Sequence, residues 1–161
     1  MRRFTPLELA IGAALVGSVL AVAVPTFVHE LHASRFVEPA DGLSRIGIAA
    51  VSFCEANERF PVSAPLTPSA PPRGRKETDP PGTWDGPTWS ALAFRPAPDG
   101  VPHAYSFSFE SPGGSTFVAQ ARGDLDGDGL LSTFEVRGEQ RRTSDGKPGV
   151  TPGMYVEAEI E

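Results

Sequence analysis

Oxygen-bearing side chains recur at a fixed spacing between residues 124 and 135, in a stretch that could bind a metal ion. Asp124, Asp126 and Asp128 alternate along the chain, and Gly129 follows the third aspartate. Ca²⁺ takes about six to eight oxygen ligands, and alternating carboxylates can converge on one point where a glycine permits a sharp turn. This spacing predicts a calcium site.

The rest of the stretch supplies the remaining ligands of a twelve-residue EF-hand-type loop. Leu130 stands at the place of the carbonyl ligand, Ser132 at the place that acts through a water molecule, and Glu135 at the place of the bidentate carboxylate. Without a cation the gathered carboxylates would repel one another. The alternative interpretation of this acidic loop (residues 124–135) is an ordinary Asp-Gly turn whose acids are solvated.

The segments on either side of the acidic loop read as strands rather than helices. Phe117–Arg122 and Phe134–Arg137 alternate apolar and polar residues, which is the period-two pattern of a half-buried strand. A calcium loop that joins two strands has no helix pair to open. We therefore expect a structural calcium staple rather than a calcium switch.

Two further segments alternate in the same way, so the sequence predicts a roughly four-stranded antiparallel sheet. One covers Tyr105–Phe109, which the turn Pro112–Ser115 follows, and the other is Met154–Ile160 near the C-terminus. Alternation of this kind is typical of strands with one buried face.

A helix is predicted before the sheet. Apolar or small residues recur there at helical spacing and form one stripe that a sheet could cover: Leu43, Ile46, Gly47, Ala50, Phe53 or Cys54, and Asn57. Pro39 and Gly42 predict a kink or a short non-helical stretch just before this segment. Helix and sheet together predict an α+β fold.

An apolar run at the N-terminus could cross a membrane. From Leu9 to Val28 there is no charged side chain, and at about 1.5 Å per residue such a helix crosses a hydrocarbon core of about 30 Å. Glu8 stands at the edge of the run, where a carboxylate is costly and therefore suggests a function. Pro25 removes a helix hydrogen bond near the far end.

These residues carry a resemblance to a known family. The stretch 4–9, Phe-Thr-Pro-Leu-Glu-Leu, followed by Ala-Val-Pro-Thr-Phe at 23–27, resembles the N-terminal segment of type IV pilins and pseudopilins. In that family a short basic leader ends in glycine, and Phe-Thr-Leu-Ile-Glu-Leu and a long apolar helix with a proline follow. Phe4, Glu8 and Pro25 match at their places.

Two positions depart from the family pattern. Pro6 replaces an aliphatic residue, which the first turn of a helix tolerates. Arg3 stands where the leader has its glycine. The second departure puts in question the leader cleavage between Arg3 and Phe4, and the N-methylation of Phe4 that follows it in the family.

The resemblance implies a non-enzymatic structural subunit of a type IV pilus or pseudopilus, with a pilin-like fold in which a long helix packs on the sheet. Glu8 would pair with the N-terminal amine of a neighbouring subunit. The partners would be other pilins, a prepilin peptidase and an assembly platform in the bacterial inner membrane. Arg2 and Arg3 place the N-terminus in the cytoplasm by the positive-inside rule, so the head would face the periplasm.

Pattern and resemblance together divide the chain into five parts. We expect a short leader (1–3), a transmembrane or filament-core helix (4–28), an amphipathic part of the helix (29–58), a Pro-rich connection (59–87) and the sheet head (88–161). The Pro-rich connection is expected to be extended and to lie on the surface.

Other interpretations remain open. A plain membrane anchor explains the apolar length but gives no reason for Glu8, and a signal peptide has a shorter apolar core. The alternative function is a membrane-anchored periplasmic calcium-binding domain that does not polymerise. A hydrolase is not expected, because His103 has no acid or nucleophile at a recognisable spacing.

Composition narrows the function further. The 161 residues carry a net charge of −6, which argues against a nucleic-acid-binding surface. Cys54 is the only cysteine, so no disulfide forms within the chain, and we expect it to be a small buried hydrophobe. His29 and His32 share one helix face, but without a nearby third ligand we expect a solvated face.

Overall fold

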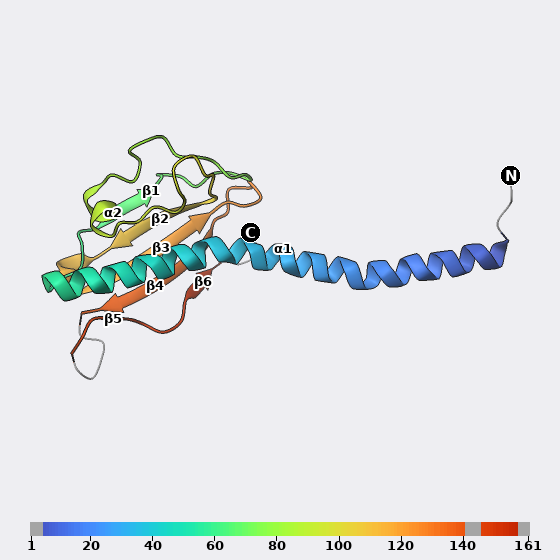
Figure 1. Cartoon of the computed structure of the whole chain (residues 1–161), viewed down its shortest axis with the longest axis horizontal. Helices are drawn as coiled ribbons and strands as arrows, with labels where there is room; N and C mark the ends of the chain where they lie inside the picture. Colours follow the sequence, from blue (N-terminus) through green and yellow to red (C-terminus); the bar gives the residue numbers. More distant parts are fainter. Residues whose placement is uncertain (1–4, 141–145, 158–161) are drawn as a thin grey trace. The chain divides into compact units, whose positions relative to one another are not determined.

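The computed structural model describes residues 5–140 and 146–157, except for the side chains of Leu9 and of residues 25–35 (Figure 1). The chain divides into two compact units, Met1–Phe36 and Val37–Glu161. The described part of the first unit is almost entirely helix, and the second unit, here called the head, combines helix with an antiparallel sheet. The α+β class and the N-terminal apolar helix are therefore confirmed.

The elements follow one another in this order: α1 (Pro6–Asn57), β1 (Ala64–Thr67), α2 (Pro87–Ala91), β2 (Tyr105–Glu110), the 3-10 turn η1 (Pro112–Gly114), β3 (Thr116–Gly123), β4 (Ser132–Glu139), β5 (Gly149–Val150) and β6 (Tyr155–Glu157). Pro6 begins α1, as expected for a proline in the first turn.

The sheet has six strands in the order β1-β2-β3-β4-β5, and β6 also pairs with β4. The three central strands match the predicted segments, and the C-terminal strand is confirmed over Tyr155–Glu157, while residues 158–161 lie outside the described part. The predicted number of four strands is too low, because β1 and β5 were missed. β5 has two residues and β1 has four, and runs this short show no alternation.

One face of α1 in the head is buried, and Figure 1 shows this part of the helix lying across the sheet. The buried side chains are Leu43, Ile46, Ala50 and Cys54, each at most 2% exposed. The predicted stripe is confirmed as far as Cys54, which is buried while Phe53 is only partly covered; Asn57 is exposed.

The predicted non-helical stretch at Pro39 and Gly42 is wrong, because α1 continues through both residues. A Cβ atom on Gly42 would lie 2.6 Å from the ring of Phe107 on β2. The glycine therefore allows an aromatic ring of the sheet to contact the helix backbone. Its role is close packing and not interruption of the helix.

Aromatic rings fill the space between helix and sheet. Phe107, Phe109 and Phe117 on β2 and β3 are at most 1% exposed. Trp84 and Phe94 join them, with the rings of Phe94 and Phe107 5.1 Å apart in an edge-to-face arrangement, a geometry that stabilises aromatic pairs.

The Pro-rich segment 59–87 is mostly exposed, but parts of it belong to the head. It contains β1, where Ala64 pairs with Phe109 of β2, and its Phe60 and Trp84 are 2% and 7% exposed. Prolines are tolerated here because β1 is an edge strand, where one row of backbone groups needs no partner.

Candidate metal site

The acidic loop brings together its three aspartates. Each of Asp124, Asp126 and Asp128 offers a carboxylate oxygen, and these oxygens lie within 4.8 Å of one another. Asp124 directly follows the last residue of β3, whereas Asp126 and Asp128 lie on the exposed part of the loop. The hairpin between β3 and β4 thus gathers three negative charges at one point.

Backbone hydrogen bonds give the loop its shape. Asp124 Oδ1 accepts a hydrogen bond from Gly127 N at 2.8 Å, and Asp128 Oδ1 accepts one from Leu130 N at 2.7 Å. Gly129 has a φ of 94°, in the left-handed region that favours glycine. The sharp turn that the sequence predicts at Gly129 is therefore present.

Asp124 is the most deeply buried of the three. Its side chain is 1% exposed, and its Oδ2 atom has no hydrogen-bond partner among the described residues. The nearest cation is Arg73, whose Nε lies 3.7 Å from Oδ2 on a side chain that is 77% exposed. A buried carboxylate oxygen without a donor is destabilising, and a metal ion would satisfy it.

The Pro-rich segment holds the acidic loop from outside, which the sequence did not reveal. Gly74 N donates to the carbonyl of Asp124 at 2.8 Å, and Arg73 forms an isolated parallel bridge with Asp124. A Cβ atom on Gly74 would lie 3.3 Å from the carbonyl oxygen of Asp126. The loop is therefore braced by a segment about fifty residues earlier in the chain.

Glu135 does not join the three aspartates. Its Oε2 accepts a hydrogen bond from Gln120 Nε2 at 2.9 Å, and its Oε1 accepts one from Arg137 Nε. Burial raises the pKa of this carboxyl, but those two hydrogen bonds and the charge of Arg137 outweigh burial, so that its pKa is lowered overall. The bidentate ligand that the sequence predicts is engaged elsewhere on the sheet.

Leu130 and Ser132 lie at the exit of the loop. Leu130 is 58% exposed, and Ser132, the first residue of β4, is buried opposite Gly123 of β3. Their roles as metal ligands stay predictions.

The donors present suit a hard divalent cation. Carboxylate and carbonyl oxygens favour Ca²⁺, Mg²⁺ or Mn²⁺ over soft metals. The group of Asp124, Asp126 and Asp128 could thus hold a metal ion, and such an ion would neutralise the gathered charge.

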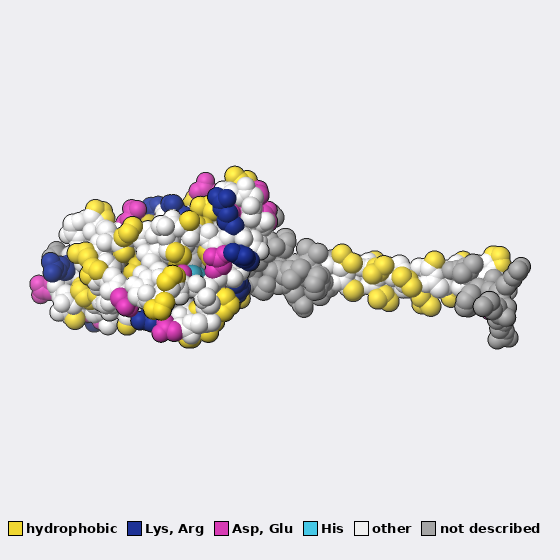
Figure 2. All heavy atoms as spheres, turned by 90° about the horizontal axis from the view of Figure 1, so that it is seen from above, with side chains coloured by type: hydrophobic (Ala, Val, Ile, Leu, Met, Phe, Trp, Pro, Cys, Tyr) yellow, Lys and Arg dark blue, Asp and Glu magenta, His cyan; other side chains and the backbone are white. Residues whose placement is uncertain are grey.

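The N-terminal segment contains the second set of predicted residues. Pro6–Val24 of α1, with a mean hydropathy of 2.2, is long and apolar enough to cross a membrane, and Figure 2 shows its exposed hydrophobic side chains. Arg3 and Phe4 lie outside the described residues, and Pro25 lies within α1.

Glu8 has a partner within its own chain. Its Oε2 accepts hydrogen bonds from the backbone N–H and the hydroxyl of Thr5 at 2.7 and 2.9 Å. Glu8 N in turn lies 3.3 Å from Thr5 Oγ1. This is a capping box, in which two residues satisfy free donors of the first helical turn.

His103 has an acid beside it that no sequence spacing indicated. Its Nε2 lies 2.7 Å from Asp79 Oδ2, and its Nδ1 lies 2.9 Å from the carbonyl oxygen of Tyr105. Asp79 also accepts a hydrogen bond from the indole of Trp84. His103 is 3% exposed, and both of its ring nitrogens lie at hydrogen-bond distance from an oxygen atom. Only the fold could reveal this pair, because Asp79 and His103 are far apart in sequence.

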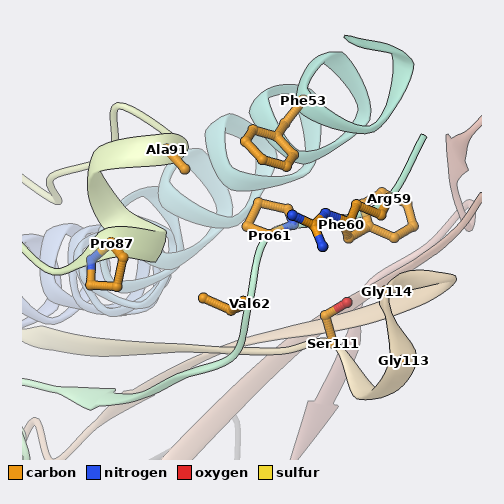
Figure 3. A pocket seen from close by; sticks show the side chains of 10 residues that line it. All are labelled: Phe53, Arg59, Phe60, Pro61, Val62, Pro87, Ala91, Ser111, Gly113 and Gly114. Carbon is orange, nitrogen blue, oxygen red and sulfur yellow. The ribbon is translucent and has the colours of Figure 1, made fainter. Parts of the chain in front are cut away.

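A pocket of about 340 Å³ lies between the end of α1, α2 and η1 (Figure 3). Its lining is mainly apolar, from Phe53, Val62 and prolines, with Arg59 beside them. Among the described residues that line it, Ser111 is the one with a hydroxyl, which donates to the carbonyl of Thr116 at 2.8 Å. None of these described lining residues is a histidine or an acid.

Comparison of the chain with protein-family models, with curated proteins and with solved structures found no match.

Proposed function

We propose that this chain is a structural, non-enzymatic subunit of a filament of the type IV pilin or pseudopilin kind. The observation that carries the proposal is the position of Glu8. It is the only charged residue in the apolar segment Pro6–Val24, and the same helix continues into a head where an antiparallel sheet covers it. An acid kept in such a segment is costly and suggests a function.

In this proposal the apolar segment anchors the subunit in the bacterial inner membrane before assembly and then packs against other subunits in the filament core. The head faces the periplasm. Glu8 pairs with the amine of Phe4 on a neighbouring subunit after a prepilin peptidase has cleaved between Arg3 and Phe4. An assembly platform in the inner membrane would extract the processed subunit.

We propose further that the metal of the acidic loop is Ca²⁺, in a structural role. Three carboxylates and the carbonyl of Leu130 supply hard oxygen ligands, and Ser132 can add one through water. The exposed position of Asp126 and Asp128 leaves room for bound waters to complete the coordination. The buried Oδ2 of Asp124 is the oxygen that gains most from the ion.

The capping box favours a second candidate function. Because Thr5 already satisfies the carboxylate of Glu8, the acid needs no neighbouring subunit to explain it. A membrane-anchored periplasmic calcium-binding domain that does not polymerise would keep Glu8 for this reason alone.

Shearing of filaments from the native host separates the two candidates. A filament subunit is expected in the sheared fraction, and mass spectrometry of that fraction should find Phe4 at the N-terminus. A chain that stays in the membrane fraction under conditions in which other filaments are released would contradict the filament proposal. Assembled chains that still carry Arg3 would contradict the processing step only.

A further inference from the structure

The face of the sheet opposite α1 carries a row of polar side chains. Gln120 of β3 lies between Arg122 and Glu135: its Oε1 accepts from Arg122 Nη2 at 2.8 Å, and its Nε2 donates to Glu135. Glu135 also binds Arg137. The carboxylate of Glu135 is thus shared by Gln120 and Arg137, and it does not reach Arg122.

Arg122 therefore has no carboxylate partner among the described residues. Within residues 5–140 and 146–157, Arg45, Arg73, Arg75, Arg95 and Arg137 each form an ion pair with an acid. Arg122 forms none in that part of the chain, although its side chain is half-buried and its Nε is fully buried without a hydrogen-bond partner. A partly desolvated guanidinium is stabilised strongly by an anion.

Arg122 lines a pocket of about 500 Å³, here called the Arg122 pocket. Three kinds of group surround it: the apolar side chains of Pro65 and Leu66 from β1, the polar side chains of Ser108 and Gln120, and the acid Glu110. Ser108 is 7% exposed and belongs to the lining of this pocket. Its hydroxyl can donate a hydrogen bond to a ligand there.

Glu110 does not neutralise Arg122. Ser106 is the residue of β2 that pairs with Arg122, and Glu110 lies four residues further along β2, which at about 3.4 Å per residue is roughly 13 Å away. The acid and the arginine therefore stand at different ends of the pocket, and no ion pair joins them.

We propose that the Arg122 pocket binds a carboxylate-bearing ligand. The carboxylate accepts hydrogen bonds from the outer nitrogens of the Arg122 guanidinium, whose planar fork matches two carboxylate oxygens. Ser108 donates a further hydrogen bond. Pro65 and Leu66 contact the apolar part of the ligand. This site is independent of the acidic loop and of the membrane segment.

The test uses the full chain in detergent micelles, labelled with ¹⁵N on arginine. The Nε–Hε signal of Arg122 is followed during a titration with sodium acetate, with sodium chloride at equal ionic strength as reference. We expect a saturable shift with a midpoint in the millimolar range for acetate only. Arg137, already paired with Glu135, should not shift.

Variants make the result specific. Arg122→Gln identifies the Arg122 signal, because that signal disappears in the variant. Acetate should also raise the melting temperature of wild type and should not raise that of Arg122→Gln. Ser108→Ala should raise the acetate concentration at the midpoint of the titration. Arg59→Gln is the matched control, because Arg59 is exposed and lies outside the pocket, and it should leave the titration unchanged.

Two sources of carboxylate are then distinguished by protein concentration. With a free small ligand the Arg122 signal is independent of protein concentration before acetate is added. With a carboxylate from a second copy of the chain the signal moves as the concentration rises. The proposal is overturned if acetate gives no saturable shift of the Arg122 signal, or if chloride gives the same shift. It is also overturned if acetate raises the melting temperature of Arg122→Gln as much as that of wild type.

Discussion

Thr5 and Glu8 cap the first turn of α1 reciprocally, since Thr5 donates twice to Glu8 Oε2 and the N–H of Glu8 points back to Thr5 Oγ1. The carboxylate therefore has a role within its own chain in addition to the pairing with a neighbour that the filament proposal requires. The two roles depend on different properties of the side chain. The cap needs an acceptor at this place, whereas the pairing needs a negative charge.

Glu8→Gln and Thr5→Ala separate these roles. Glutamine can also fill the third helical position of a capping box, so Glu8→Gln should keep the helix start and membrane insertion but lower the yield of sheared filaments. Thr5→Ala removes the capping hydroxyl at a cost of about 1 kcal/mol but keeps the charge, and its filament yield should stay close to wild type. A normal filament yield in Glu8→Gln together with a lowered yield in Thr5→Ala would show that Glu8 acts only through the cap.

Calcium should stabilise the head. At a Kd of about 10⁻⁴–10⁻³ M, which is common for extracellular calcium modules, millimolar Ca²⁺ adds roughly 0.4–1.4 kcal/mol to the free energy of unfolding. The full chain in detergent micelles should thus melt a few degrees higher in Ca²⁺ than in chelator, measured by circular dichroism. Mg²⁺ should substitute poorly because it gives up its waters reluctantly.

Three variants give this experiment its controls. Asp126→Ala should abolish the calcium-dependent change in melting temperature, and Glu139→Ala, an exposed acid at the other end of β4, should not. Glu135→Gln should keep the change, because the structure engages Glu135 with Gln120 and Arg137. Loss of the calcium effect in Glu135→Gln would instead restore Glu135 as a ligand.

Glu135 should make stability depend on pH on the acid side. Its pKa is lowered in the folded head, where the hydrogen bonds from Gln120 and Arg137 and the charge of Arg137 outweigh burial. A lowered folded pKa stabilises the protein above the unfolded pKa, which is about 4.3 for glutamate, and this stabilisation is lost as the pH falls through the folded value. In chelator, the melting temperature of wild type should fall more steeply below about pH 4.3 than that of Glu135→Gln. Parallel curves would contradict this assignment.

Gly42→Ala should destabilise the head by about 1–3 kcal/mol, the usual cost of overpacking a core. The added Cβ would lie 2.6 Å from the Phe107 ring, which is itself fully buried. Gly17→Ala is the matched control, since a Cβ there meets no atom within 4 Å. Denaturant unfolding followed by tryptophan fluorescence measures both, and equal stability of the two variants would contradict close packing at Gly42.

Glu38→Ala should lower the free energy of unfolding by about 1–3 kcal/mol, because it leaves two backbone N–H groups without an acceptor. Glu38 Oε1 accepts from the N–H groups of Ala104 and Tyr105 at 2.7 and 3.1 Å, and Oε2 lies 3.2 Å from Lys76 Nζ. Glu38→Gln keeps an acceptor and should cost less. Lys76→Ala tests the surface ion pair alone and should change the melting temperature little.

The features that the sequence determined are periodic or local. The alternation of apolar and polar residues predicted β2, β3 and β4. The apolar stripe at i, i+3 and i+4 predicted the buried face of α1 from Leu43 to Cys54. The spacing of Asp124, Asp126 and Asp128 predicted that their carboxylates lie together. The Thr5–Glu8 capping box was also readable from a spacing of three residues, although Glu8 was interpreted only by its charge. Each of these features depends on residues that lie only a few positions apart in the chain, so it can be predicted from a single sequence.

Only the tertiary structure showed which side chains already have hydrogen-bond or packing partners. Glu135 stands at the twelfth place of a calcium loop by spacing, but its carboxylate accepts hydrogen bonds from Gln120 on the neighbouring strand and from Arg137 on its own strand. Pro39 and Gly42 predict a helix break from the local sequence, yet α1 continues through both residues. Gly42 lies against the ring of Phe107, and this contact is visible only in the fold. His103 meets Asp79, and Arg122 meets no acid within the described residues. Apart from Arg137 and Glu135, the residues in these relationships are far apart in sequence. The register of the strands and the packing of the head bring them together, and no local sequence pattern predicts that.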